Sequence, residues 1–386
     1  MVDQSRNRPA CTDKYGMPEP RAMKHSVKFM KSLALCVPAI RRLRESRDTL
    51  LAERDALQAQ VDTCFQSMAA ARAELAAFKE DPETLRPRTS PFFHYHSAFD
   101  VVKCIQEYAA PELKPRAGYL TNYLGVIIDP KFFPQILSVS GREGEIESLP
   151  IPGNWHADMA EFAAALRAVS LSGDRFTMIE LGCGWGCWMN NTGVAARRTG
   201  REVHLIGVEA DEGHMRFARE ACAANDFDAS SISLHHGVAA ASSGVALFPR
   251  QGRPGVSWGL EPIFGVTNIQ REQCLQSGEY DELPMLALAD LAATHERIDF
   301  LHMDIQGGEA DLIEQCLPFL QEKIAYLFVG THSRQVEGRV FDSLLRIGWR
   351  LEIERPGFLN LDGVRPYMWV DGVQGWRNPT LVPISS

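Results

Sequence analysis

The chain has 386 residues, which is enough for one catalytic domain and an additional segment. Its formal net charge of −9 argues against nucleic acid as the main partner, because phosphate binding requires a basic surface. Nine cysteines, an odd number without the paired spacing of a zinc site, predict reduced thiols and a cytoplasmic location.

Residues 1–37 are polar and are expected to form a flexible tail. The early apolar stretch Leu33–Ile40 contains Pro38 and is far too short to cross a bilayer, so no transmembrane segment is expected. Four basic residues precede this stretch: Arg21, Lys24, Lys28 and Lys31. They leave open a contact with the inner membrane surface, and a disordered basic tail is the alternative.

Residues 38–80 are rich in Ala, Leu, Glu and Arg, which predicts one long helix. Two positions of a heptad repeat are mostly apolar, as a coiled coil requires. The first position holds Ile40, Arg47, Arg54, Val61, Met68 and Leu75, and the second holds Leu43, Leu50, Leu57, Cys64, Ala71 and Phe78. We therefore expect self-association through residues 38–79, with a helix packed on its own domain as the alternative. The proline-containing segment 81–91 predicts a semi-rigid linker.

Residues 92–152 are expected to form a cap that recognises the substrate, because the aromatic stretches at 91–96 and 119–123 suit packing over a sheet edge. Ordinary core packing is the alternative. The main domain is expected at 153–386 and opens with an amphipathic helix from Asn154. Trp155, His156 and Asp158 are candidate substrate residues at its start. Helix capping by Asn154 or Asp158 is the competing interpretation.

A glycine-rich turn follows the apolar strand Phe176–Leu181. Three alternating glycines, Gly182, Gly184 and Gly186, allow a tight turn and the close approach of a ligand. A second strand, Val203–Val208, is followed by Glu209, which is placed to accept hydrogen bonds from ribose hydroxyls. These features predict a cofactor with a nucleoside, bound at the carboxyl edge of a parallel sheet.

The acid before the first glycine distinguishes two such cofactors. Glu180 would repel the pyrophosphate of a dinucleotide but would suit the ammonium group of S-adenosylmethionine. The Glu-x-Gly-x-Gly-x-Gly spacing resembles motif I of the class I S-adenosylmethionine-dependent methyltransferases. The candidate cofactor-binding residues are Glu180, Gly182, Cys183, Gly184, Gly186, Glu209 and Ala210.

Alternating strands and helices predict an α/β, Rossmann-like sheet that is mostly parallel. Strands are expected at 176–181, 203–208, 231–235, 300–303, 325–329, 350–354 and 367–370, and helices at 187–199, 212–225, 286–293 and 309–317. We expect the last two strands to form the terminal hairpin of the methyltransferase fold, with an antiparallel last strand. The long segment 248–280 is expected to be a lid.

A second resemblance narrows the family. Ile298–Glu309, with an aspartate at a strand end and a following Gly-x-Glu, resembles the strand-four signature of FkbM-type methyltransferases, and the helix at 286–293 is typical of them. Residues 330–333 and 371–379 are similar to a bacterial subgroup. The resemblance covers about residues 150–380. It implies an S-adenosylmethionine-dependent methyltransferase, although Gln306 stands where these proteins usually carry Glu.

Methyl transfer to a hydroxyl requires alignment and often a base. His332 is the first candidate base, because an imidazole titrates near neutral pH. Asp304 is expected to orient this imidazole or to bind a divalent cation such as Mg²⁺, and His302 shares its strand face. Gln306 is a further candidate substrate residue.

The resemblance implies an O-methyltransferase that acts on a hydroxyl of a bacterial saccharide or glycan, as in polysaccharide biosynthesis. One alternative is methylation of a polyketide or another secondary metabolite. Another is a non-catalytic assembly protein that binds the cofactor and associates through residues 38–79.

Overall fold

The computed structural model describes residues 90–133, 142–154, 156–361 and 363–384. The expected tail, coiled coil and nearly all of the linker lie outside these residues. No helix within the described ranges is long and apolar enough to cross a membrane.

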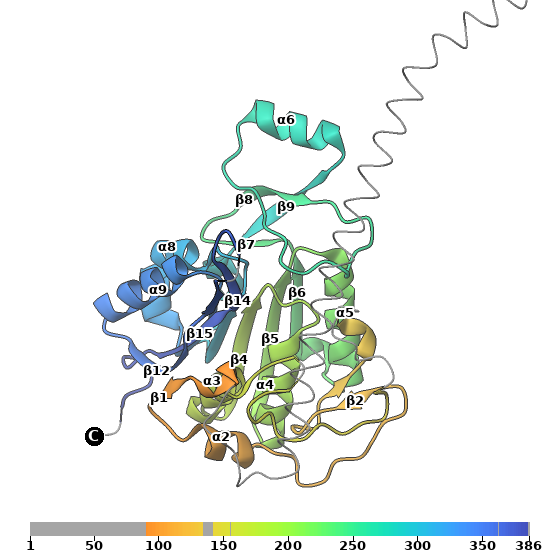
Figure 1. The fold of residues 1–386 in the computed structure, drawn as a ribbon, viewed down its shortest axis with the longest axis vertical. Coiled ribbons are helices and arrows are strands. Elements are labelled where there is room, and N and C mark those ends of the chain that lie inside the picture. Colours follow the sequence, from red (N-terminus) through yellow and green to blue (C-terminus); the bar gives the residue numbers. More distant parts are fainter. Residues whose placement is uncertain (1–89, 134–141, 155, 362, 385–386) are drawn as a thin grey trace, which may run out of the picture. The chain divides into compact units, whose positions relative to one another are not determined.

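An eight-stranded sheet forms the centre of the domain, in the order β1-β12-β15-β11-β10-β4-β5-β6 (Figure 1). Its strands are β1 (His96–Ser97), β4 (Arg175–Leu181), β5 (Glu202–Glu209), β6 (Ile232–His236), β10 (Phe300–Met303), β11 (Tyr326–Thr331), β12 (Arg350–Arg355) and β15 (Gly372–Arg377). The five strands from β6 to β11 are parallel, and β15 is antiparallel to both of its neighbours. The expected α/β, Rossmann-like and mostly parallel sheet is confirmed, as are six expected strands with ends that differ by up to two residues.

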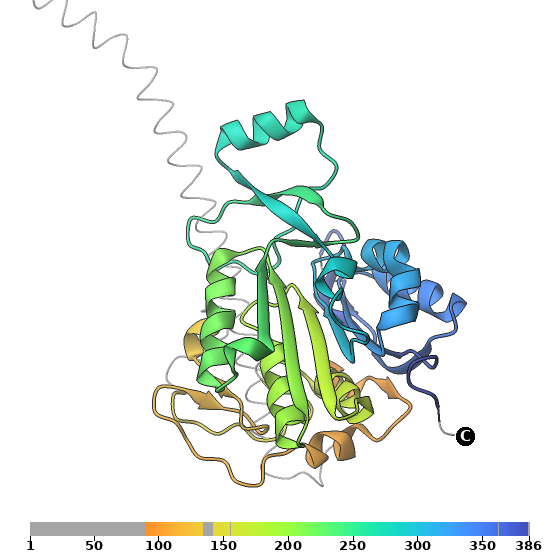
Figure 2. The ribbon, with the colours of Figure 1, turned by 180° about the vertical axis from the view of Figure 1, so that it is seen from behind.

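Helices cover both faces of the sheet (Figures 1 and 2). They are α2 (Val101–Glu107), α3 (Met159–Leu171), α4 (Cys187–Arg198), α5 (Glu212–Ala224), α8 (Glu309–Lys323) and α9 (Arg334–Arg346). Because side chains alternate along a strand, Phe300 packs in the core with α3, α4 and α5, whereas Leu301 packs in the core with α8 and α9. The expected helices at 187–199, 212–225 and 309–317 are confirmed, the last one longer than expected.

The predicted terminal hairpin is wrong in one respect. The strand that pairs with β12 and β11 is β15, which the sequence analysis missed. The expected strand 367–370 exists as β14 (Tyr367–Val370), but it pairs with β13 (Phe358–Asn360) in a separate two-stranded sheet. This small hairpin is inserted between the two strands that complete the large sheet.

The segment expected to be a lid contains regular structure. It lies within an insertion between β6 and β10. The insertion consists of β7 (Val238–Ala240), β8 (Gly244–Pro249), α6 (Asn268–Ser277) and β9 (Tyr280–Ala287), followed by α7 (Leu288–Leu291). Strands β7, β8 and β9 form a separate three-stranded sheet. Because β9 continues to Ala287, the expected helix at 286–293 is reduced to α7. Helix α6 has no buried residue and projects from the carboxyl edge of the large sheet (Figure 1).

The described part of residues 92–152 packs on one side of the domain. It contains β1, α2, a small hairpin of β2 (Leu120–Thr121) and β3 (Ile127–Ile128), and short 3-10 turns at Pro91–Phe93 and Pro130–Phe132. Elsewhere in the domain, another 3-10 turn, Ala229–Ser231, precedes β6. Strand β1 extends the large sheet beside β12, and α2 packs on α3. Most apolar side chains here join the core of α3 and α4.

Candidate active site

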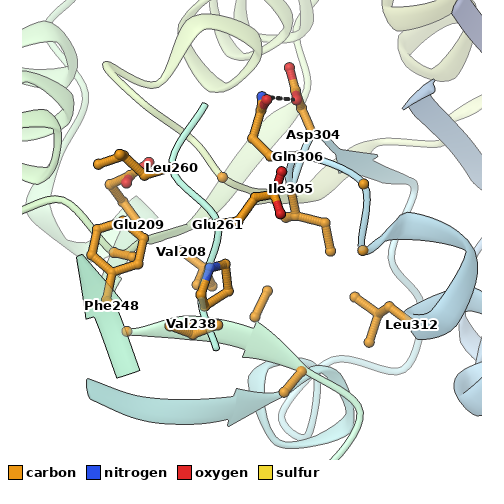
Figure 3. A pocket seen from close by; sticks show the side chains of 18 of the residues that line it. Val208, Glu209, Val238, Phe248, Leu260, Glu261, Asp304, Ile305, Gln306 and Leu312 are labelled. Atoms are coloured by element: carbon orange, nitrogen blue, oxygen red, sulfur yellow. Dashed lines mark hydrogen bonds between the residues drawn. The ribbon is translucent and has the colours of Figure 1, made fainter. Parts of the chain in front are cut away.

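A cavity of about 620 Å³ lies at the carboxyl ends of β4, β5 and β10 (Figure 3). Its walls include Gly182 and Gly184 after β4, Glu209 at the end of β5, and Asp304 after β10. The segment Ser257–Glu261, which we call the strap, lines another side. Ligands of open parallel sheets bind at this edge, so the position agrees with the expected cofactor site.

The glycine turn has the backbone that its sequence predicts. Gly182, Gly184 and Gly186 have φ values of 72°, 54° and 76°, which side chains other than glycine rarely adopt. A Cβ atom on Gly182 would also overlap the backbone carbonyl oxygen of Asp304. The turn therefore requires glycine both for its conformation and for its contact with the segment after β10.

Glu180 lies behind this turn and is not among the residues that line the cavity. Its side chain is buried, and its two carboxylate oxygens accept the N–H groups of Trp188 and Met189 at 3.1 and 2.9 Å. Burial raises the pKa of Glu180 to about 8. In this structure Glu180 stabilises the start of α4. A direct contact between Glu180 and the ammonium group of S-adenosylmethionine stays a prediction. The hydrogen bonds to α4 do not favour it, because they occupy both carboxylate oxygens.

Glu209 faces the cavity and connects β5 to the glycine turn. One carboxylate oxygen accepts the Gly184 N–H at 2.8 Å, and the other accepts the Asp211 N–H at 2.8 Å. Burial raises the pKa of Glu209. A carboxylate has about four acceptor positions, so Glu209 can still accept from a ligand hydroxyl. Ala210 also lines the cavity, whereas Cys183 does not.

Asp304, His332 and Glu309 meet at the ends of β10 and β11. The two ring nitrogens of His332 lie 3.1 Å from a carboxylate oxygen of Asp304 and 3.1 Å from one of Glu309. Burial alone would lower the pKa of His332, but the two carboxylates raise it to about 10. Burial would raise the pKa of Asp304, but His332 holds it below the usual value. His332 is therefore an imidazolium at neutral pH in this structure, which does not suit the expected role of base.

His302 does not join this group. Its ring is buried beside Phe328, with ring centroids 4.9 Å apart, and lies 3.7 Å from a carboxylate oxygen of Glu180. Burial lowers the pKa of His302 to about 4, so the ring is neutral. It does not line the cavity. The structure gives His302 a packing position next to the start of α4.

Two other expected substrate residues, Asp158 and His156, also lie away from the cavity. Asp158 is buried, caps α3 through the N–H groups of Ala160 and Glu161, and lies 2.5 Å from Arg355. This confirms the capping interpretation. His156 packs among aromatic rings, and burial lowers its pKa to about 3. Neither residue lines the cavity, and Trp155 lies outside the described residues.

Gln306 does line the cavity. Its amide nitrogen donates to Asp304 at 3.0 Å, and its φ of 59° is in the left-handed region. This backbone conformation is uncommon for a residue other than glycine and is typical of functional sites. The candidate substrate residue thus lies next to the candidate catalytic carboxylate.

Two parts of the site were not predicted from the sequence. Glu309 stood in the Gly-x-Glu signature without an assigned role, although it is the buried partner of His332. The strap was expected only as an unspecified part of a lid. Its Trp258 packs against Gly184 and lies 4.2 Å from the ring of His214.

The cavity is acidic. Its lining includes five carboxylates and, among the described residues, no lysine or arginine. The five are Glu209, Asp211, Glu261, Asp304 and Asp311. Such a lining favours a cationic ligand and disfavours a pyrophosphate.

Comparisons with known proteins bear on the family of the chain. Residues 173–346 match the methyltransferase FkbM domain. A protein of Jannaschia sp. (strain CCS1) named "Putative methyltransferase" is 41% identical over 278 residues, which cover 72% of this chain and 98% of that protein. Among solved structures, methyltransferase FkbM from Methylobacillus flagellatus KT is 12% identical with a TM-score of 0.34, covering 55% of this chain and 53% of that one. The human methyltransferase 10 domain-containing protein is 11% identical with a TM-score of 0.30, covering 56% and 80%. These structural scores are low, so the assignment rests on the sequence matches. The chain belongs to the FkbM family of methyltransferases, whose fold implies S-adenosylmethionine as the methyl donor.

Proposed function

We propose that the protein transfers a methyl group from S-adenosylmethionine to a hydroxyl of a bacterial saccharide or glycan. The observation that carries the donor is the acidic cavity next to the glycine turn. S-adenosylmethionine has a cationic sulfonium and an ammonium group, which a cavity lined by carboxylates, and by no lysine or arginine of the described residues, favours. Glu209, at the end of β5, is placed for the ribose.

Asp304 is the group that receives the acceptor. It lines the cavity, and its carboxylate is kept ionised beside the His332 imidazolium. During transfer, the acceptor oxygen forms a bond to the methyl carbon while the carbon–sulfur bond breaks and its electron pair returns to sulfur. Asp304 accepts the hydroxyl proton in this step, and Glu309 holds His332 in position.

A divalent cation is the alternative use of the same residues. Ligand atoms of Asp304, Glu309 and His332 lie within 4.8 Å of one another. Two carboxylates and one imidazole suit Mn²⁺ or Zn²⁺ better than Mg²⁺, which prefers oxygen ligands. A bound cation would polarise the acceptor oxygen, and it would have to displace a proton from His332. Loss of activity with a chelator, restored by Mn²⁺, is the result expected if a cation is used.

The hairpin of β13 and β14 supports a saccharide acceptor. Tyr367 and Trp369 are 54% and 58% exposed and, being two residues apart on a strand, share one face. Asn360 pairs with Tyr367 and donates to its hydroxyl at 2.9 Å. Exposed rings next to amide and hydroxyl groups match the apolar faces and the hydroxyls of sugar rings. The pairing of Thr331 with Gly372 places the base of the hairpin next to His332.

Self-association through residues 38–79 is a separate part of the proposal, supported by the heptad pattern alone. We expect sedimentation of the full chain to give a defined oligomer, and a chain that begins at residue 85 to sediment as a smaller species. Equal oligomeric states would contradict this part.

The acceptor class can be tested with labelled donor. Polysaccharide from a strain that lacks this gene should accept labelled methyl groups from S-adenosylmethionine when the purified protein is added. Asp304→Asn should reduce transfer by roughly 100-fold or more, within the usual contribution of a proton-accepting side chain, and should leave donor binding measurable. Labelling confined to the small-molecule extract of that strain would favour the secondary-metabolite alternative. Donor binding without any transfer would favour the assembly protein.

A further inference from the structure

The strap closes over the glycine turn and is held there by close contacts. A Cβ atom on Gly184 would lie 2.8 Å from the Trp258 ring, and one on Gly259 would lie 3.1 Å from the side-chain oxygen of Gln306. The strap therefore contacts both the turn after β4 and the segment after β10. The first of these sides contacts Glu209 through the Gly184 N–H, and the second carries Asp304.

Four of the five lining carboxylates already have partners within the protein. Glu209 accepts two backbone N–H groups, and Asp211 caps α5. Asp304 contacts His332, and Asp311 lies 2.5 Å from Arg339.

Glu261 differs from these four carboxylates. Among the described residues, none donates a hydrogen bond to its side chain or forms an ion pair with it. Figure 3 shows this side chain extending from the strap toward Ile305, on the Asp304 side of the cavity. Glu261 is exposed, and its carboxylate is free to contact a ligand cation that enters the acidic cavity.

We infer that Glu261 binds the ammonium group of the methionine part of S-adenosylmethionine. This rests on the proposed donor. Glu209 marks the ribose position, so the methionine part extends toward the glycine turn and Asp304, where the strap lies. Glu261 thus takes the role that the sequence suggested for Glu180, whose oxygens are engaged by α4.

Three ligands separate this role from a general effect on the cavity. S-adenosylmethionine and S-adenosylhomocysteine both carry the ammonium group. 5′-Methylthioadenosine keeps the adenine, the ribose and the thioether but lacks the amino-acid part. Calorimetric titration of the full chain with all three compares wild type, Glu261→Gln and Glu272→Gln. Glu272 is an exposed carboxylate on α6 that does not line the cavity, so its variant is the matched control.

Glu261→Gln should weaken S-adenosylmethionine and S-adenosylhomocysteine by about tenfold each, as expected for the loss of one charge-assisted contact. Its affinity for 5′-methylthioadenosine should equal that of wild type, which also shows that the variant cavity is folded. Glu272→Gln should bind all three ligands like wild type. Unchanged binding of all ligands by Glu261→Gln, or equal weakening of all three, would overturn the inference. If wild type binds none of them, the proposed donor fails as well.

Discussion

The contact between Glu209 and the glycine turn can be tested by Glu209→Gln. This change replaces one carboxylate oxygen by an NH₂ group, which then faces either the Gly184 N–H or the Asp211 N–H. One buried N–H loses its acceptor, and the remaining hydrogen bond loses its charge. An unsatisfied buried polar group costs about 1–3 kcal/mol, and the weakened second bond adds about 1 kcal/mol. We therefore expect a loss of about 2–4 kcal/mol in the free energy of unfolding.

A matched control lies at the opposite end of the same strand. Glu202 is exposed and contacts Arg175 and His204 at the surface, where solvent screens such contacts and they contribute little to stability. Urea denaturation followed by circular dichroism should show a much larger shift for Glu209→Gln than for Glu202→Gln. Calorimetry should also show weaker binding of S-adenosylmethionine by the first variant. Equal stability of the two variants would refute the role assigned to the Glu209 hydrogen bonds.

Three further predictions concern the turn, the imidazolium and the donor. Gly184→Ala should weaken donor binding more than Gly200→Ala, because both have positive φ but only Gly184 contacts Trp258; equal calorimetric affinities would contradict this. In NMR titrations of ¹⁵N-histidine with chelator present, His332 should titrate with a pKa of about 10. A midpoint near 6.5 would contradict its contacts with two carboxylates. Because this pKa is raised by folding, the stability it contributes should be complete below pH 6.5 and lost as the pH rises through 10; His332→Gln should lack this loss. S-adenosylmethionine should bind more tightly than S-adenosylhomocysteine in calorimetry, since the product has lost the sulfonium charge that the acidic cavity attracts; tighter product binding would contradict it.

The elements that the sequence predicted have strong local signals. Strand β4, the glycine turn and the acid at the end of β5 follow from apolar runs and from the conformations that only glycine adopts readily. Strand β15 has no such signal, because its short sequence contains Gly372 and Gly375. Gly375 is required by packing: a Cβ atom there would lie 2.6 Å from Ile353 and 2.7 Å from the hydroxyl of Tyr326. The apolar β14 has the stronger local pattern, so the sequence predicts β14 instead.

The sequence predicts where the site lies, but it does not predict which side chains contact one another there. The order of strands brings Glu209, Asp304 and His332 to one edge, as expected from the sequence. Which way a buried carboxylate points depends on the nearest free N–H groups, and α4 supplies these to Glu180. The pairing of His332 with Glu309 depends on the loop between β10 and α8, whose left-handed backbone at Gln306 has no clear sequence signal.

A crystal structure of the protein with S-adenosylmethionine is the most direct test of the account. The ribose hydroxyls should donate to Glu209, and the methyl group should face the side of the cavity where Asp304 lies. A complex in which the donor binds elsewhere, or in which a pyrophosphate-containing ligand occupies the acidic cavity instead, would contradict the assignment.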